Sequence, residues 1–190
     1  MGNTLLFSTI PRLEGERIVI KRLEDADAQA LWEFSHSDEV YRYLPTFLFE
    51  QQFQNMHECI AQMYGPLFAN KESIILGIYL RDGMQFCGLF EFYGFRDDMH
   101  KISIGYRLLE RYWGQGIATE AVRLAVHYLY AKIEIELITA STMVENRASA
   151  QVLYKNGFVW TTQADEDWGF EQPTLADKWF TSPIEGAAPH

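Results

Sequence analysis

The stretch Lys101–Ala131, KISIGYRLLERYWGQGIATEAVRLAVHYLYA, changes from one hydrophobic periodicity to another across a turn that contains two glycines. Its first part, Lys101–Leu109, alternates apolar and polar residues as a half-buried strand does. Its last part, Ile117–Ala131, repeats apolar residues at the spacing of an amphipathic helix. The stretch therefore predicts a strand that leads through the loop Trp113–Gly116 directly into a helix.

The loop Trp113–Gly116 has the composition of an anion-binding turn. A helix that starts there gathers backbone N–H groups without intrahelical partners and the positive end of its dipole at one point. Glycines keep side chains away from an anion, and the small Ala118 lets the first turn approach it closely. Because neither GxxxxGK[ST] nor GxGxxG is present, two familiar nucleotide sites are excluded. On this pattern alone, a glycine turn kept for tight packing is the alternative to a phosphate site.

The rest of the chain alternates the same two periodicities, with short turns between the segments 73–80, 86–95 and 101–109. These three predict an antiparallel meander. We expect strands over 17–23, 73–80, 86–95, 101–109, 134–140, 158–162 and 175–181, and helices over 24–35, 50–64, 117–131 and 146–156. Residues 1–182 are expected to form a single domain, followed by a flexible C-terminal tail over 183–190.

The charge and the cysteines restrict the partners and the compartment. A formal net charge of -10 disfavours nucleic acid and anionic membranes; it favours cationic ligands such as amines, or merely keeps the protein in solution.

Cys59 and Cys87 lack the spacing of metal ligands and predict buried, reduced thiols. Residues 1–9 lack the features of a signal peptide, and no stretch approaches the roughly 20 apolar residues of a membrane span. A cytoplasmic protein is expected.

No metal site is expected, because the histidines are scattered without ligand spacing. Packing or surface roles are expected for His36, His57, His100, His127 and His190.

Two segments resemble the motifs of one enzyme family. Ile104–Leu109 followed by Tyr112–Ala121 resembles the acetyl-CoA motif of the GNAT N-acetyltransferases. Glu145–Phe158 resembles the second motif of that family, at the expected distance downstream. The resemblance implies an α+β fold, the GNAT fold, whose central, mostly antiparallel, splayed mixed sheet of about seven strands is flanked by about four helices. It also implies transfer of an acetyl group from acetyl-CoA to a primary amine by direct attack in a ternary complex.

The N-terminal part narrows the resemblance to one branch of the family. Glu16–Leu23, with Asp25-Ala26 and Tyr43–Pro45, is similar to the RimJ/RimL-like branch, which includes ribosomal-protein N-terminal acetyltransferases. A protein N-terminal α-amine is therefore one expected acceptor. The resemblance covers roughly Glu16–Phe180. Dimers are common in the family, so a homodimer is an expectation that the resemblance carries.

The resemblance assigns the cofactor to two groups of residues. The edge of the strand at Arg107, Leu108 and Leu109 would pair with the pantetheine arm, and an N–H near Leu108 would polarise the thioester carbonyl. Gly105 would suit a bulge that opens the gap, although a glycine in a strand equally accommodates packing. The family's loop pattern, Gln/Arg-x-x-Gly-x-Gly/Ala, places Trp at its first position here, as this branch commonly does. The remaining cofactor positions are Trp113, Gly114, Gln115, Gly116, Ile117, Ala118, Thr119, Asn146 and Ser149.

The catalytic residues are less clearly marked. Glu91 is the lone charge in an aromatic strand and is expected to take the amine proton, with Glu50 as the second candidate; a solvent-facing or ion-paired Glu91 is the alternative. The family's thiolate-protonating tyrosine falls on Leu153, and Tyr154 is rotated from that position by about 100°. Ser149, one turn earlier, is expected to hydrogen-bond the sulfur, or else only to satisfy the first helical turn.

Several other functions remain compatible with these patterns. A non-catalytic acyl-CoA-binding domain would keep the loop without the chemistry, and an interaction module would use the glycines for packing alone. Among enzymes, an acetyltransferase for a polyamine, an aminoglycoside or an amino acid competes with one for a protein N-terminus. The acidic composition suits any cationic acceptor and does not separate them.

Overall fold

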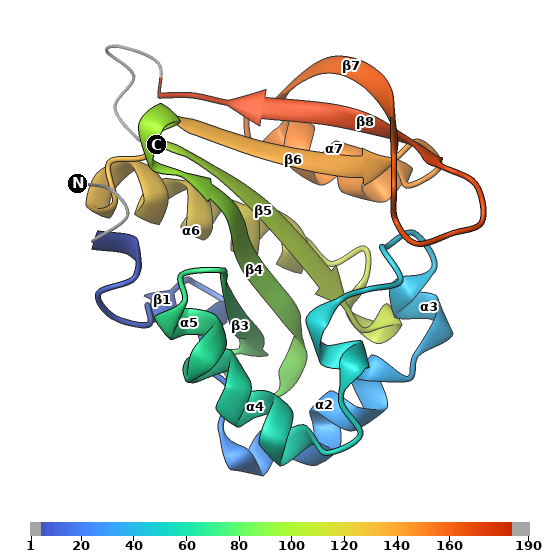
Figure 1. Cartoon of the computed structure of the whole chain (residues 1–190). Coiled ribbons are helices and arrows are strands. Elements are labelled where there is room, and N and C mark those ends of the chain that lie inside the picture. The colour runs from blue at the N-terminus through green and yellow to red at the C-terminus, as the bar shows by residue number, and fades with distance from the viewer. Residues whose placement is uncertain (1–4, 184–190) are drawn as a thin grey trace.

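The computed structural model describes residues 5–183 and has an α+β architecture around one eight-stranded sheet with the strand order β1-β2-β3-β4-β5-β6-β8-β7 (Figure 1). The strands are β1 (Leu13–Glu14), β2 (Ile18–Lys21), β3 (Ser73–Leu80), β4 (Phe86–Arg96), β5 (Lys101–Leu108), β6 (Leu137–Met143), β7 (Val159–Glu166) and β8 (Thr174–Thr181). The α-helices are α2 (Ala28–Ser35), α3 (Asp38–Tyr41), α4 (Met56–Tyr64), α5 (Pro66–Ala69), α6 (Ile117–Lys132) and α7 (Arg147–Lys155). Short 3-10 helices are η1 (Asp25–Asp27), η2 (Phe49–Gln52), η3 (Asp97–Met99) and η4 (Glu110–Tyr112). Apart from Pro183, the predicted tail lies outside the described residues.

The sheet opens between β5 and β6. All neighbouring strands pair antiparallel except these two, which are parallel. Only their first residues pair, Lys101–Ser103 of β5 with Leu137–Thr139 of β6. Beyond Ser103 the strands diverge, so β6, β8 and β7 form a separate half of the sheet (Figure 1). The predicted splayed, mostly antiparallel sheet is confirmed. The expected bulge at Gly105 was wrong, because Gly105 pairs in register with Glu91.

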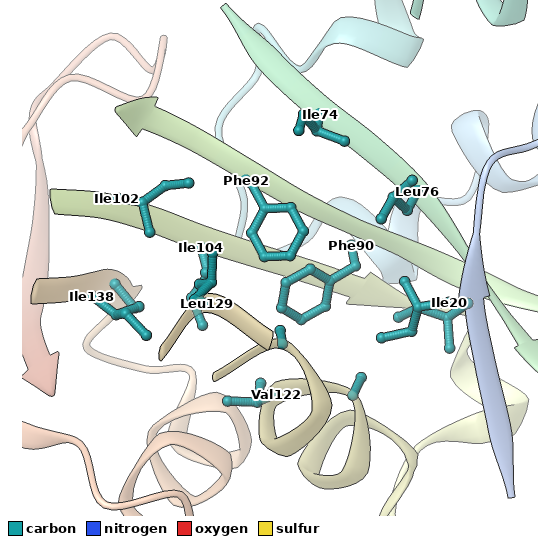
Figure 2. Packing of buried hydrophobic residues seen from close by; sticks show 14 of the residues in the cluster. Ile20, Ile74, Leu76, Phe90, Phe92, Ile102, Ile104, Val122, Leu129 and Ile138 are labelled. Atoms are coloured by element: carbon teal, nitrogen blue, oxygen red, sulfur yellow. The ribbon is translucent and has the colours of Figure 1, made fainter. Parts of the chain in front are cut away.

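One face of the sheet packs against α6 (Figure 2). Alternation sends every second side chain of β4 and β5 to this face, where Phe90, Phe92 and Ile104 are almost fully buried. Val122 and Leu129 of α6 close the same cluster from the other side, as the helical spacing predicts. This continuous apolar layer fixes the start of α6 relative to the end of β5.

The opposite face packs against α2, α4 and α5. Their buried residues, including Leu31, Phe34 and Met63, join Ile75 and Leu89 of the sheet in a second cluster. Since these helices precede β3 in the chain, they cover only the half of the sheet that ends at β5 (Figure 1). The opening between β5 and β6 is thus bordered by helices from both faces.

The structure corrects four local predictions. The two-residue β1 was missed, because it is too short for a periodic signal. β6 starts at Leu137 and not at 134, although Ile135 is buried in the preceding connection. The helix expected over 50–64 is interrupted, because the side chain of Asn55 accepts hydrogen bonds from two backbone N–H groups and starts α4 afresh. The helix expected over 24–35 is α-helical only over Ala28–Ser35 and follows the 3-10 turn η1. Within it Trp32 is 44% exposed and stacks on His36.

None of the helices within residues 5–183 is long and apolar enough to cross a membrane. Cys59 and Cys87 are both buried and unpaired, as expected. Burial raises the pKa of the Cys59 thiol to about 12 and that of Cys87 to about 11, so neither is ionised near neutral pH.

Candidate active site

The loop between β5 and α6 holds two glycines in left-handed conformations. Gly114 has φ +67°, and Gly116, the N-cap of α6, has φ +76°. The first N–H groups of α6 have no intrahelical partner, and the helix dipole adds partial positive charge there. The loop borders a cavity of about 360 Å³ lined by Trp113, Gly114, Gly116, Ile117, Ala118 and Thr119. Gln115 was also predicted to contact the cofactor, but it is not among the residues that line this cavity. Its side-chain amide donates to the carbonyl oxygen of Arg111 (2.7 Å).

The loop is supported from behind by the turn between β1 and β2. Nη1 of Arg17 donates to the carbonyl oxygen of Gln115 (2.8 Å). The buried Glu120, in the first turn of α6, accepts through Oε1 from the backbone N–H groups of Glu16 (2.9 Å) and Arg17 (3.0 Å). The turn between β1 and β2, more than a hundred residues away in the sequence, thereby holds the glycine loop in place.

Replacing Glu120 by alanine is expected to lower the free energy of unfolding by about 2 kcal/mol, because two backbone N–H groups lose their acceptor. Glutamine keeps a carbonyl oxygen at this position and should cost less. Urea denaturation of the two variants beside the wild type measures the difference. Equal stability of Glu120→Ala and the wild type would contradict the role of this carboxylate.

Backbone groups at the end of β5 face the opening. The N–H of Leu109 donates to the carbonyl oxygen of Cys87 in the β4 direction (2.9 Å). Because hydrogen-bonding direction alternates along an antiparallel strand, Arg107 also faces β4, whereas Tyr106 and Leu108 face the gap toward β6. Of the three residues expected to pair with a pantetheine arm, only Leu108 therefore presents its N–H to the opening. Leu109 packs against the core instead.

Trp113 ties the loop to the strand. Its indole Nε1 donates to the carbonyl oxygen of Leu108 (2.9 Å), and its ring borders the 360 Å³ cavity. The carbonyl of Leu108 is thus occupied, while its N–H still faces the gap. A glutamine or arginine could also donate here, but the indole adds a rigid apolar wall.

α7 reaches the opening through Ser149. Asn146 caps the helix by accepting from the N–H of Ser149 (3.2 Å), as predicted for the cap. The Tyr106 hydroxyl lies 2.7 Å from Oγ of Ser149 and 3.2 Å from the carbonyl oxygen of the same residue, so its one proton can be donated to either atom. Burial raises the pKa of Tyr106, so the phenol stays protonated. Leu153 is fully buried and Tyr154 is 70% exposed, so Tyr154 points away from the opening.

A second cavity, of about 450 Å³, lies on the other side of Tyr106 and Ser149. Glu91 of β4 lies at its border and is 14% exposed. Its Oε1 accepts from the Ser73 hydroxyl (2.7 Å), and its Oε2 contacts Nη1 of Arg107 (3.3 Å). The structure therefore gives Glu91 an ion-pair partner and also access to a cavity.

Arg107 and Glu50 form a buried pair that the sequence did not reveal. Nε and Nη2 of Arg107 donate to the two carboxylate oxygens of Glu50 (2.6 and 2.7 Å), and the Tyr41 hydroxyl donates to Glu50 Oε1 (2.7 Å). Burial by itself would raise the pKa of Glu50, but the Arg107 guanidinium outweighs it and holds the pKa below its ordinary value. Fully buried and bonded at both oxygens, Glu50 is a structural anion. The single carboxylate in the apolar segment 43–53 was the available signal.

The two cavities meet at residues that border both of them: Tyr43, Leu44, Tyr106, Arg107, Asn146 and Ser149. One cavity starts at the glycine loop, and the other is bordered by Glu91 and three further acidic residues. The arrangement suits a long, phosphate-bearing molecule in the first and a smaller cationic one in the second. Within residues 5–183, no group of three or more His, Cys, Asp or Glu side chains is placed to hold a metal ion.

Comparisons with known proteins agree with this geometry. Residues 17–159 match the family model described as an acetyltransferase (GNAT) domain. The uncharacterized N-acetyltransferase YoaA of Bacillus subtilis is 28% identical over 150 residues, covering 78% of this chain and 82% of YoaA. The [ribosomal protein uS5]-alanine N-acetyltransferase of Escherichia coli is 22% identical over 156 residues, 80% of each chain.

The fold is also shared with solved structures. Mycobacterium smegmatis RimJ, solved in complex with CoA-disulfide, superimposes with a TM-score of 0.78 at 17% identity and covers 95% of this chain and 90% of its own. The glycine loop, the open edge of β5 and the family match agree with one another. The chain belongs to the GNAT family and is an acetyl-CoA-dependent N-acetyltransferase.

Proposed function

We propose that the protein acetylates the primary amine of a cationic acceptor that binds in the Glu91 cavity while acetyl-CoA occupies the loop cavity. The meeting of the two cavities at Tyr106 and Ser149 is the observation that carries this proposal. With acetyl-CoA in one cavity and the acceptor in the other, the thioester and the amine would meet at this junction. The acetyl group could then pass directly to the amine, with no covalent intermediate on the protein. The buried, un-ionised Cys59 and Cys87 support direct attack, because a thiolate is the form that would accept an acetyl group.

In this proposal the loop Gly114–Thr119 binds the pyrophosphate through its backbone N–H groups. The N–H of Leu108, which faces the opening, holds the thioester carbonyl and then the oxyanion. Acetyl-CoA supplies the acyl group, and the protein holds the thioester in position for attack. Lys155 borders the same cavity and adds a positive charge near the phosphates.

Glu91 is proposed to receive the proton of the attacking amine, directly or through a water molecule. The Ser149 hydroxyl is proposed to hydrogen-bond the departing sulfur. The neutral Tyr106 phenol lies next to it and can donate to Oγ of Ser149, which leaves the serine proton free to turn toward the sulfur.

The acceptor cavity favours a cation. Glu72, Glu91, Glu166 and Asp167 border it. Glu166 is paired with Lys178, and Arg107, the only basic residue among the lining residues, is paired with Glu50 and contacts Glu91, so Glu72 and Asp167 contribute most of the uncompensated charge. The Escherichia coli relative is named for acetylating an alanine of a ribosomal protein. A protein N-terminal amine is our first candidate acceptor for this chain, and a polyamine is the second, because the acidic border suits several positive charges.

Thiol release from acetyl-CoA in the presence of candidate amines tests the proposal. The panel contains peptides with free and blocked N-termini, lysine-blocked peptides, polyamines and aminoglycosides. Release that depends on one of these acceptors is expected. No release above background, with calorimetry still detecting acetyl-CoA, would make the protein a binding domain and overturn the proposal.

Replacing Gly116 by alanine is expected to weaken acetyl-CoA binding about tenfold, because a side chain would crowd the loop amides. Gly157→Ala is the matched control: Gly157 has a similar φ of +81° and follows α7, and a Cβ there meets no atom within 4 Å. At Gly116 a Cβ would meet only Nη2 of Arg17, at 3.0 Å. Both variants should therefore lose similar stability, about 1–2 kcal/mol. Calorimetry should show weaker binding for Gly116→Ala alone; equal affinities would contradict the loop assignment.

A further inference from the structure

The pairing of β4 with its two neighbours places four residues around Glu91. β4 lies between β3 and β5 in the sheet (Figure 1). The residue opposite Glu91 is Ile75 on β3 and Gly105 on β5. In antiparallel strands, opposite residues and those two positions further along project to the same face. The face that carries the Glu91 side chain therefore has Ser73 on one diagonal and Arg107 on the other.

The carboxylate of Glu91 is open on the β5 side. Gly105 has no side chain to cover it, and both residues border the 450 Å³ cavity. A Cβ added at Gly105 would meet only the ring of Tyr93, at 3.5 Å, so the space beside this glycine belongs to the cavity. On the β3 side the opposite residue, Ile75, is fully buried. An acceptor in the cavity can thus approach Glu91 from the direction of β5.

The two diagonal neighbours hold the carboxylate unequally. Ser73 donates its hydroxyl proton to Oε1 of Glu91 at 2.7 Å. Nη1 of Arg107 lies 3.3 Å from Oε2, whereas charge-assisted hydrogen bonds of this kind are usually about 2.7–2.9 Å long. Nε and Nη2 of Arg107 are bound to Glu50 at 2.6 and 2.7 Å, so the guanidinium is not free to turn closer. The serine hydroxyl therefore fixes the position of the carboxylate more closely than the ion pair does.

Ser73 is well placed to resist the attraction of Arg107. It is the first residue of β3, is 6% exposed and pairs with Tyr93 of β4, so its backbone is held by the sheet. Without the hydroxyl, the attraction between opposite charges would draw Glu91 toward Nη1 of Arg107. A carboxylate drawn onto a guanidinium accepts a proton less readily, because the cation stabilises the charged form.

We propose, building on the function proposed above, that Ser73 is the positioning residue of Glu91: its hydroxyl holds the carboxylate apart from Arg107 and directed at the acceptor. Each carboxylate oxygen can accept two hydrogen bonds, so both oxygens of Glu91 keep a free site beside their present partners. As the bond between the amine nitrogen and the acetyl carbon forms, the amine proton passes to such a site, directly or through water. Ser73 keeps its own proton and touches neither reacting group.

Steady-state kinetics of Ser73→Ala tests the proposal, with a peptide that starts with alanine and a linear polyamine as acceptors. We expect kcat to fall about tenfold, because the base is displaced from the amine. KM for acetyl-CoA and KM for the acceptor should not change, since the loop cavity and the charge of Glu91 both remain. Ser73→Thr keeps the hydroxyl, and its kcat should stay within about twofold of the wild type.

Ser35→Ala is the matched control for the lost hydroxyl. Ser35 is 7% exposed, its hydroxyl donates to the carbonyl oxygen of Trp32 (2.9 Å), and it is not among the residues that line either cavity. Thermal unfolding should show similar losses of stability in Ser35→Ala and Ser73→Ala, while kcat falls in Ser73→Ala alone. An equal fall of kcat in both variants would mean that Ser73 only stabilises the fold.

A double variant shows whether Ser73 acts through Glu91. In Ser73→Ala/Glu91→Gln, kcat should be no lower than in Glu91→Gln, because no base is left to position. A further tenfold loss in the double variant, an unchanged kcat in Ser73→Ala, or an equal loss in Ser73→Thr would overturn the inference. A kcat of Glu91→Gln close to that of the wild type would instead remove the proposed role of Glu91, and absence of release with both acceptors would overturn the proposed function itself.

Discussion

Replacing Arg107 by methionine is expected to lower the free energy of unfolding by about 3–5 kcal/mol, because the change leaves the buried carboxylate of Glu50 without its cation. Methionine has a similar length and fills most of the space, so the loss reports charge and hydrogen bonds more than volume. Arg107 also contacts Glu91 at 3.3 Å, and the variant would bring two carboxylates together without the guanidinium between them. Denaturation in guanidinium chloride measures the change.

An exposed pair of the same geometry is the control for Arg107→Met. Arg96 also directs Nε and an Nη to one carboxylate, that of Asp98, at 3.1 and 3.0 Å, but both partners are exposed. Arg96→Met should therefore change stability little, since exposed pairs are screened by water and salt. If both variants lost a similar free energy of unfolding, burial would not make the Arg107–Glu50 pair contribute more than an exposed pair.

The pH dependence of Arg107→Met distinguishes lost charge from lost packing. In the wild type the pKa of Glu50 is below its unfolded value, so its stabilising effect is complete above the unfolded pKa and is lost only as pH falls through the folded pKa. In the variant only the hydrogen bonds from Tyr41 and the backbone still oppose burial, so the pKa of Glu50 should rise, and stability should be lost as pH rises through that value. The stability gap between wild type and variant should be larger at pH 8 than at pH 5. A gap independent of pH would point to packing alone.

The parts of the molecule that were predictable are those with a local signal. The strand, loop and helix in Lys101–Ala131 follow from periodicity and glycine placement, and Asn146 follows from the preference of helix caps. The glycine loop needs only neighbours in sequence, so its residues could be named before the fold was known. The proposed roles of these residues rest on that geometry and on the acetyl-CoA chemistry of the family.

The parts that were not predictable depend on contacts between distant segments. Glu50 meets Arg107 across 57 residues, and Thr46 meets Trp168 across 122. No periodicity marks such partners, because each depends on where the whole chain places two loops. The direction of the backbone groups of Leu108 and Leu109 was hidden for a similar reason: it is set by the pairing of β5 with β4, which a single strand does not specify.

Replacing Glu91 by glutamine is expected to lower kcat about a hundredfold at neutral pH, because the amide cannot take the proton of the amine. Glutamine keeps the shape and an oxygen that can accept from the Ser73 hydroxyl, so the fold around it should persist. KM for acetyl-CoA should not change, since the loop lies in the other cavity. Steady-state kinetics with a saturating acceptor measures both constants.

Two further measurements decide whether Glu91 transfers a proton or only attracts a cation: the pH dependence of the defect in Glu91→Gln, and a control substitution at a second carboxylate of the same cavity. As pH rises toward the pKa of the acceptor, about 7.7–8.0 for an α-amine, more amine is already neutral, and the defect of Glu91→Gln should shrink. Glu72→Gln is the matched control, because Glu72 is exposed and borders the same cavity. Loss of attraction would raise KM for the acceptor in both variants, whereas loss of the base lowers kcat in Glu91→Gln alone. A kcat for Glu91→Gln close to that of the wild type at all pH values would exclude Glu91 as the base and leave the amine to lose its proton to water.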